Sequence, residues 1–107
     1  MEWIGAAQRR LRRRRGGGSL RASKRELLAL WLQQGKRCAV TGMQVDQPQL
    51  DHKVPLSKGG THSVGNLQWV HPRLNQAKGS DTDEAVRTWL LAAADALRQK
   101  IKLEELL

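Results

Sequence analysis

The stretch LDHKVPLSKGG, residues 50–60, combines the pattern of a β-strand with two side chains that carry chemistry. Apolar residues alternate with other residues from Leu50 to Leu56, which is the two-residue period of a half-buried strand. The glycine pair at 59–60 ends the pattern in a turn. Asp51 and His52 lie inside this strand. They are therefore either part of an active site or a polar interruption in a buried strand.

The next segment, NLQWVHPRLNQAKG at 66–79, completes a small supersecondary unit. LQWV predicts a strand at 67–70. Proline is disfavoured inside a helix but favoured at its first position, so Pro72 predicts a short helix that ends before Gly79. The order strand, loop, strand, helix is a β-β-α unit.

A helix is predicted on each side of this unit. Ser23 and Glu26 have the spacing of a capping box and begin a helix at 24–34. Asp81 and Glu84 have the same spacing before a helical apolar stripe, which predicts a long helix over about 82–103 packed on the first helix and on the β-β-α unit. The fold class is therefore α+β.

Most of the net charge of +9 lies near the N-terminus, where residues 1–25 hold nine Lys or Arg against one Glu. Trp3, Ile4, Ala7 and Leu11 would share one side of a helix, but GGGS follows and would uncouple it. We therefore predict a flexible basic arm over residues 1–22. Such an arm suits nucleic acid, because neutralised phosphates release their counterions. The expected contacts are Arg9, Arg10, Arg12, Arg13, Arg14 and Arg15.

Length and composition limit the remaining possibilities. A chain of 107 residues allows one small domain, placed at 23–107 with its core at about 38–79. No apolar run approaches the ~20 residues of a membrane-spanning helix, and no signal-peptide pattern is present, so we expect a cytoplasmic protein without membrane partners. Cys38 is the only cysteine, which excludes an intramolecular disulfide.

The β-β-α hairpin could bring Asp51, His52, Asn66 and Asn75 into one pocket. Hydrolysis of a phosphodiester needs a base for the attacking water and a cation that neutralises charge on the phosphate. An imidazole titrates near neutral pH and can be that base. Carboxylate and amide oxygens suit Mg²⁺ or Mn²⁺.

The two quoted segments together resemble the HNH endonucleases, also called His-Me finger or ββα-metal nucleases. The resemblance covers about residues 38–79. It implies that His52 is the general base, that Asp51 and Asn75 bind one divalent metal ion, and that Asn66 orients His52. The expected products carry a 5′-phosphate and a 3′-hydroxyl.

One departure concerns the structural zinc that many family members hold with two Cys-x-x-Cys pairs. The matching positions here are Cys38, Thr41, His71 and Leu74. A closed tetrahedral site needs four ligands, so we expect a zinc-free variant of the family. Packing of Trp31, Trp69 and Trp89 is expected to replace the zinc.

Each residue also has a simpler interpretation. His52 taken alone is a core histidine, and the two asparagines are a turn residue and a polar helix residue. Neighbours on a strand point to opposite faces, so a shared site for Asp51 and His52 requires a local irregularity there. His62 is expected on the loop surface, and His71 is expected either to cap the short helix or to pack near Cys38. Further phosphate contacts, with solvated lysines as the alternative, are predicted at Lys53, Lys58, Arg73 and Lys78.

The sequence thus predicts a metal-dependent DNA endonuclease. A monomer would nick one strand, and a homodimer could cleave both. The alternative is a non-catalytic DNA-binding protein on the same fold, and the charge does not exclude RNA as the substrate.

Overall fold

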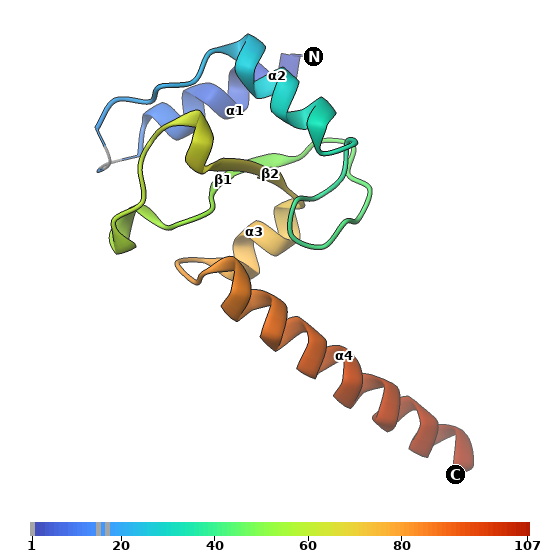
Figure 1. Cartoon of the computed structure of the whole chain (residues 1–107). Helices are drawn as coiled ribbons and strands as arrows, with labels where there is room; N and C mark the ends of the chain where they lie inside the picture. The colour runs from blue at the N-terminus through green and yellow to red at the C-terminus, as the bar shows by residue number, and fades with distance from the viewer. Residues whose placement is uncertain (1, 15, 17) are drawn as a thin grey trace.

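The computed structural model describes residues 2–14, 16 and 18–107. Figure 1 shows a small two-stranded sheet between helices, and a long helix that leads away from this body to the C-terminus. The elements in chain order are α1 (Glu2–Arg12), α2 (Lys24–Gln33), β1 (Gln49–His52), η1 (Leu56–Lys58), η2 (Val64–Asn66), β2 (Leu67–Val70), α3 (Pro72–Lys78) and α4 (Asp83–Leu106).

The two strands pair antiparallel and have different neighbours on their two faces. Leu50 lies opposite Trp69, and Asp51 lies opposite Gln68. Helices α1 and α2 cover one face, and α3 lies on the other (Figure 1). Because side chains alternate along a strand, Leu50 and His52 point toward α1 and α2, whereas Asp51 points toward α3.

The predicted α+β class with its β-β-α unit is confirmed, and β2 and α3 begin and end where the sequence indicates. The predicted first strand over 50–56 is too long, because β1 ends at His52. The Val54 side chain is 45% exposed rather than in the core. Pro55 has no N–H for a ladder, and the Val54 backbone binds a side chain instead of a partner strand.

The prediction of a flexible arm over residues 1–22 is wrong for α1, which packs on the core. Ile4, Ala7 and Leu11 are buried against α2 and the sheet. Nε2 of Gln8 donates to the Ala22 carbonyl at 2.7 Å and so ties α1 to the segment before α2. Gly16 and Gly18, with φ values of 93° and 78°, follow α1 without uncoupling the helix from the core.

A cluster of three tryptophans lies between α1, α2 and β2. The Trp3 ring meets those of Trp31 and Trp69 edge to face, with centroids 5.8 and 5.1 Å apart. The predicted role of Trp89 in this packing is wrong, since that side chain is 64% exposed on α4. Trp3 takes its place in the cluster.

Two of the four positions that the resemblance matches to zinc ligands lie in a second apolar cluster. Cys38 and Leu74 are buried there with Val40, Val70 and Val86. The His71 side chain instead caps α3, where Nδ1 accepts from the Arg73 N–H at 3.0 Å. The predicted capping role of His71 is therefore confirmed.

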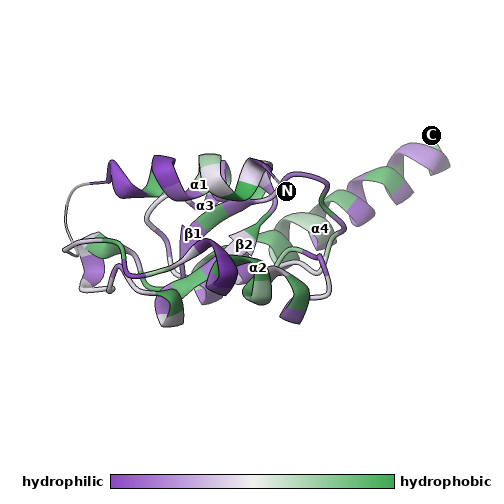
Figure 2. Ribbon diagram, turned by 90° about the horizontal axis from the view of Figure 1, so that it is seen from above, coloured by the Kyte–Doolittle hydropathy of each residue, from purple (hydrophilic) through white to green (hydrophobic). Residues whose placement is uncertain are grey.

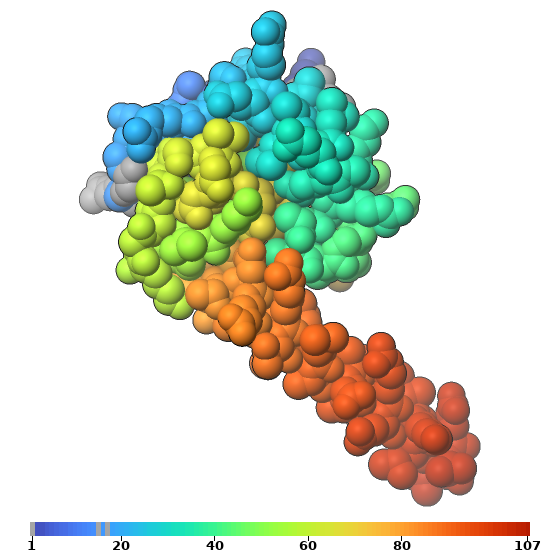
Figure 3. Space-filling model, viewed as in Figure 1, coloured from blue at the N-terminus to red at the C-terminus, as the bar shows by residue number. Residues whose placement is uncertain are grey.

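Helix α4 joins the body only through its first turns. The Thr82 hydroxyl caps it by accepting from the Ala85 N–H at 3.1 Å, so the predicted Asp81 capping box is one residue too early. Val86 is buried and Leu90 packs beside it. Beyond these residues α4 stands out as a rod (Figure 3), with hydrophobic and hydrophilic residues interspersed (Figure 2). The predicted packing of this helix on α2 is wrong.

No helix within the described part of the chain combines the length and the hydropathy needed to cross a membrane.

Candidate active site

Asp51 and His52 line the same hollow at the end of β1. The hollow has a volume of about 200 Å³, and its other lining residues come from the end of α1, the loop after β1 and the turn after α3: Arg14, Pro55, Leu56, Ser57, Gly79 and Ser80. Strand pairing is regular through both residues. The predicted irregularity is therefore the strand end itself, where side chains that leave on opposite faces reach one space.

Asn75 lines a neighbouring hollow of about 520 Å³ rather than the one that holds Asp51 and His52. Arg14, Gly79 and Ser80 line both hollows, so the two adjoin. Nδ2 of Asn75 donates to Oε1 of Gln49 at 3.0 Å, which leaves the Asn75 oxygen without a hydrogen bond to a described residue. The structure therefore brings Asn75 next to Asp51 but not into its hollow.

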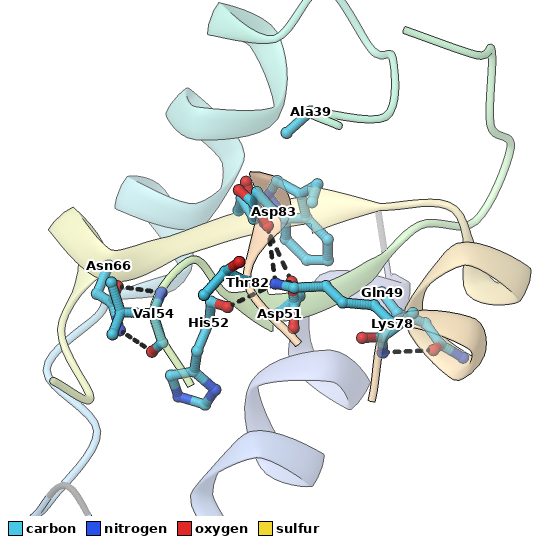
Figure 4. A network of polar contacts seen from close by, with 12 residues as sticks. Ala39, Gln49, Asp51, His52, Val54, Asn66, Lys78, Thr82 and Asp83 are labelled. Atoms are coloured by element: carbon cyan, nitrogen blue, oxygen red, sulfur yellow. Dashed lines mark hydrogen bonds and ion pairs between the residues drawn. The ribbon is translucent and has the colours of Figure 1, made fainter. Parts of the chain in front are cut away.

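Lys78 holds Asp51 from the side of α3. The Lys78 side chain is only 1% exposed. Its Nζ forms an ion pair with Oδ2 of Asp51, pairs with Oδ1 of Asp83 at 2.9 Å, and donates to the His52 carbonyl at 2.9 Å (Figure 4). The prediction that Lys78 contacts phosphate is wrong, because the ammonium is buried and each of its three protons has a protein acceptor.

Gln68 completes this network. Its Nε2 donates to Oδ2 of Asp51 at 3.1 Å and to Oδ1 of Asp83 at 2.9 Å. Two carboxylates thus share one ammonium and one amide. The remaining oxygen of Asp51, Oδ1, makes no hydrogen bond to a described residue, and Asp51 faces the hollow.

Asn66 positions the loop after β1 rather than His52. Its Oδ1 accepts from the Val54 N–H at 2.9 Å, and its Nδ2 donates to the carbonyls of Val54 at 3.0 Å and Thr61 at 2.8 Å. Figure 4 shows the Asn66 side chain directed at Val54, apart from the His52 ring. The predicted hydrogen bond to His52 is absent, because the loop backbone occupies both polar atoms of the Asn66 amide.

Gly60 allows this loop to close on itself. A Cβ built on Gly60 would lie 1.8 Å from the Val54 carbonyl oxygen and 2.9 Å from Nδ2 of Asn66. Such a contact is impossible without movement of the backbone. The second glycine of the pair, Gly59, has a φ of 87°. Gly60 is therefore required because the Val54 carbonyl lies so close to it, and Gly59 is favoured because of its positive φ.

The side chain that does contact His52 is His62, which is predicted from the sequence to lie on the loop surface. His62 is 1% exposed, and its Nδ1 lies 2.8 Å from Nε2 of His52. The planes of the two rings are inclined to each other by only 23°. A histidine ten residues after His52, just past a glycine turn, was the signal that could have indicated this contact.

The surroundings keep the His52 imidazole neutral. Burial, and then the neighbouring His62 and Arg14, lower the pKa of His52 from 6.5 to about 4, against a smaller raising effect of the Asp51 carboxylate. Burial also lowers the pKa of His62, and Arg14 adds to that effect. At neutral pH His52 is therefore unprotonated and able to accept a proton.

The donor set is suited to a hard divalent cation that keeps much of its water. Among the described residues, no group of three or more His, Cys, Asp or Glu side chains is placed to hold a metal ion. One oxygen of Asp51 and one of Asn75, in adjoining hollows, make no hydrogen bond to any described residue. One or two protein oxygens with water and phosphate are what Mg²⁺ accepts.

The predicted basic contacts, Lys78 excepted, lie on the surface. Arg9, Arg10, Arg12 and Arg13 are exposed on or just after α1. Lys53, Lys58 and Arg73 are also exposed, and of these Arg73 lines the larger hollow. Arg14 is exposed as well, and it lines both hollows. Arg15 lies outside the described residues.

These features define a class of domain: a ββα unit with an Asp-His pair at the end of its first strand and an asparagine on its helix. The family model HNH endonuclease matches residues 35–81. Residues 35–81 therefore match the HNH endonuclease family, and this segment contains the whole ββα unit. The HNH domain indicates a nuclease or a nucleic-acid-binding function. Searches of curated proteins and of solved structures found no match to the chain.

Proposed function

We propose that this protein is a metal-dependent DNA endonuclease that hydrolyses phosphodiester bonds and leaves a 5′-phosphate and a 3′-hydroxyl. The observation that carries the proposal is the hollow at the end of β1, in which a neutral imidazole and a carboxylate face the same space. Two arginines, Arg14 and Arg73, border the adjoining hollow with Asn75. Base, oxygen ligands and phosphate-binding cations thus adjoin one another.

In this proposal His52 takes the proton of the attacking water, and its lowered pKa keeps it available for that step. Asp51 and Asn75 would hold a divalent ion, Mg²⁺ or Mn²⁺, which supplies charge neutralisation at the phosphate. Lys78 and Gln68 fix the Asp51 carboxylate through Oδ2, so that Oδ1 is presented to the hollow. Arg14 binds the phosphate from the side of α1.

DNA would approach across the face that carries the exposed arginines of α1. Each phosphate that a basic side chain neutralises adds to the salt dependence of binding, with a slope of about 0.9 per contact for duplex DNA. The positive charge of this surface comes from the exposed arginines Arg9, Arg10, Arg12, Arg13 and Arg14. Among the described residues, we assign no helix or strand to the reading of base edges. We therefore propose binding that is strong at low salt and weakly dependent on sequence. A single chain would nick one strand, and two cooperating chains would cleave both.

One observation favours a second candidate, a DNA-binding protein without catalysis. The Asp51 carboxylate already has an ion-pair partner in Lys78. A cation must therefore bind to a carboxylate whose charge is largely neutralised. If that neutralisation prevents metal binding, the basic surface remains and only binding is left.

Plasmid relaxation separates the two candidates. The wild type is incubated with supercoiled DNA and Mg²⁺ or Mn²⁺, beside His52→Ala, Asn75→Ala and an EDTA control. If the protein is an endonuclease, nicked circles should form only with wild type and metal. A DNA ligase should seal these nicks, because it requires a 5′-phosphate and a 3′-hydroxyl. Equal relaxation by wild type and His52→Ala would refute catalysis at this site. A mobility shift without nicking would establish the binding protein.

A further inference from the structure

We propose that His62 is a positioning residue for His52, which holds the proton of the His52 ring on Nε2 and leaves Nδ1 free to accept the proton of water. The inference rests on the proposed function in assigning His52 as the base, and it adds the residue that prepares this base. The contact between Nε2 of His52 and Nδ1 of His62, at 2.8 Å, carries it.

Two neutral rings in hydrogen-bond contact share one proton between the facing nitrogens. Either His52 donates through Nε2–H, or His62 donates through Nδ1–H. In the first arrangement Nδ1 of His52 is bare and can act as a base. In the second arrangement the proton of His52 lies on Nδ1, and the ring has no nitrogen left for water. The direction of this hydrogen bond therefore decides whether His52 can act.

The surroundings of His62 favour the first arrangement. Nε2 of His62 is buried and makes no hydrogen bond to a described residue. Nδ1 of His62 is occupied by the contact with His52, so the Leu11 carbonyl, which opposes the larger lowering of the His62 pKa by burial, acts on the remaining nitrogen, Nε2. A carbonyl oxygen can only accept, so it favours a proton on the nitrogen that His52 does not use. A proton on Nε2 of His62 leaves Nδ1 as the acceptor for His52.

The fold holds His62 firmly enough for this role. Its carbonyl accepts from the Arg21 N–H at 2.9 Å, and the Val64 N–H donates back to the Arg21 carbonyl at 3.3 Å. Arg21 and Ser63 form a parallel bridge between the segment before α2 and the loop. On the other side, Asn66 ties Thr61 to the end of β1. His62 is thus fixed on both sides, and its hydrogen-bond contact with His52 aligns the two ring planes to within 23°.

The test reads the tautomer directly, in metal-free protein at pH 8, by two-bond ¹H–¹⁵N correlation spectra of the imidazoles. Wild type is expected to show His52 as the Nε2–H tautomer. His62→Asn places an amide oxygen near the former Nδ1 and should keep both the tautomer and the cleavage rate within a few-fold. His62→Leu removes the acceptor and should give mixed tautomers, with kcat lowered about 10- to 100-fold, the range found for residues that orient a functional histidine, and KM unchanged.

His71→Leu is the matched control, since it removes a histidine that caps α3 and lines neither hollow. It should leave the His52 tautomer unchanged. A wild-type His52 with its proton on Nδ1 would overturn the inference, as would a folded His62→Leu variant with unaltered tautomer and kcat. The wild-type spectrum needs neither variant nor DNA. Failure of wild type to nick plasmid would therefore overturn the proposed function alone, while the tautomer still decides the role of His62.

Discussion

The Lys78 ammonium is shared by two carboxylates inside the protein, so the cost of removing it can be worked out from its contacts. Lys78→Met keeps most of the volume and deletes the charge. Asp51 and Asp83 then lose their ion pair, and the His52 carbonyl loses a hydrogen bond. Breaking a buried pair by removing one partner costs about 3–5 kcal/mol. We expect this loss in the free energy of unfolding, and a melting temperature lower by about 12 °C or more.

Urea denaturation followed by tryptophan fluorescence measures the change, since three tryptophans pack in the core. Lys100→Met is the control, because Lys100 pairs with Glu104 at 3.6 Å on an exposed helix turn. Exposed pairs of this kind contribute about 0.5 kcal/mol or less. Adding Asp83→Asn to Lys78→Met should recover part of the loss, because it leaves one carboxylate fewer without its cation.

The alternative role of Lys78, a phosphate contact, predicts the opposite pattern. In that case Lys78→Met would unfold within about 0.5 kcal/mol of wild type, as surface substitutions usually do. It would also weaken DNA binding and reduce the salt dependence. That result would refute the buried network and with it the role that we assign to Lys78 in presenting Asp51.

Three further measurements test the loop, the basic surface and the histidine pair. Gly60→Ala should destabilise the protein by about 1–3 kcal/mol through overpacking against Val54. Gly65→Ala, where a Cβ meets open space, should be neutral in the same melts. Arg14→Ala and Arg13→Ala should weaken DNA binding alike in a salt titration, but only Arg14→Ala should lower kcat, because Arg14 lines the hollows; equal kcat values would argue against its role at the phosphate. The unfolded chain protonates His52 near pH 6.5 and the folded protein only near pH 4, so stability should be full above pH 6.5 and should fall by at most about 3 kcal/mol toward pH 4. The difference between wild type and His52→Gln in urea denaturation at each pH isolates this loss, and parallel curves would contradict the lowered pKa.

The elements that the sequence predicts correctly are those with local signals at both ends. Pro72 begins α3 and Gly79 follows its last residue, so the bounds of this helix follow from the chemistry of two residues. The capping box of Ser23 and Glu26 likewise begins α2. The Asp-His pair could be recognised as a site because adjacent functional side chains need only the end of a strand to reach one space. These features depend on neighbours along the chain.

The features that the sequence does not reveal depend on contacts between distant segments. Burial of Lys78 requires its ion pair with Asp51. Asp51 lies 27 positions earlier in the chain, on the face of β1 that points toward α3. A lysine on a short helix looks the same in sequence whether it is solvated or buried. His62 presents the same difficulty, since its partner His52 lies across a loop whose path is set by the Asn66 amide. The strand-like alternation of residues up to Leu56 is misleading for the same reason. The Val54 N–H binds the side chain of Asn66 and not a partner strand.

The incorrect prediction about α1 changes how the site itself is understood. A flexible basic arm would raise local DNA concentration and leave the chemistry to residues 50–79. Instead, burial of Ile4, Ala7 and Leu11 fixes the helix against the sheet, and this places Arg14 at both hollows. The same helix brings the Leu11 carbonyl to His62, and the segment that follows holds the His62 backbone through Arg21. The N-terminal segment therefore acts on His52 through two routes, the charge of Arg14 and the ring of His62. Both routes depend on the packing of α1 around Trp3. A substitution in the tryptophan cluster should therefore change the pKa and the tautomer of His52, even though the substituted residue does not line the hollow.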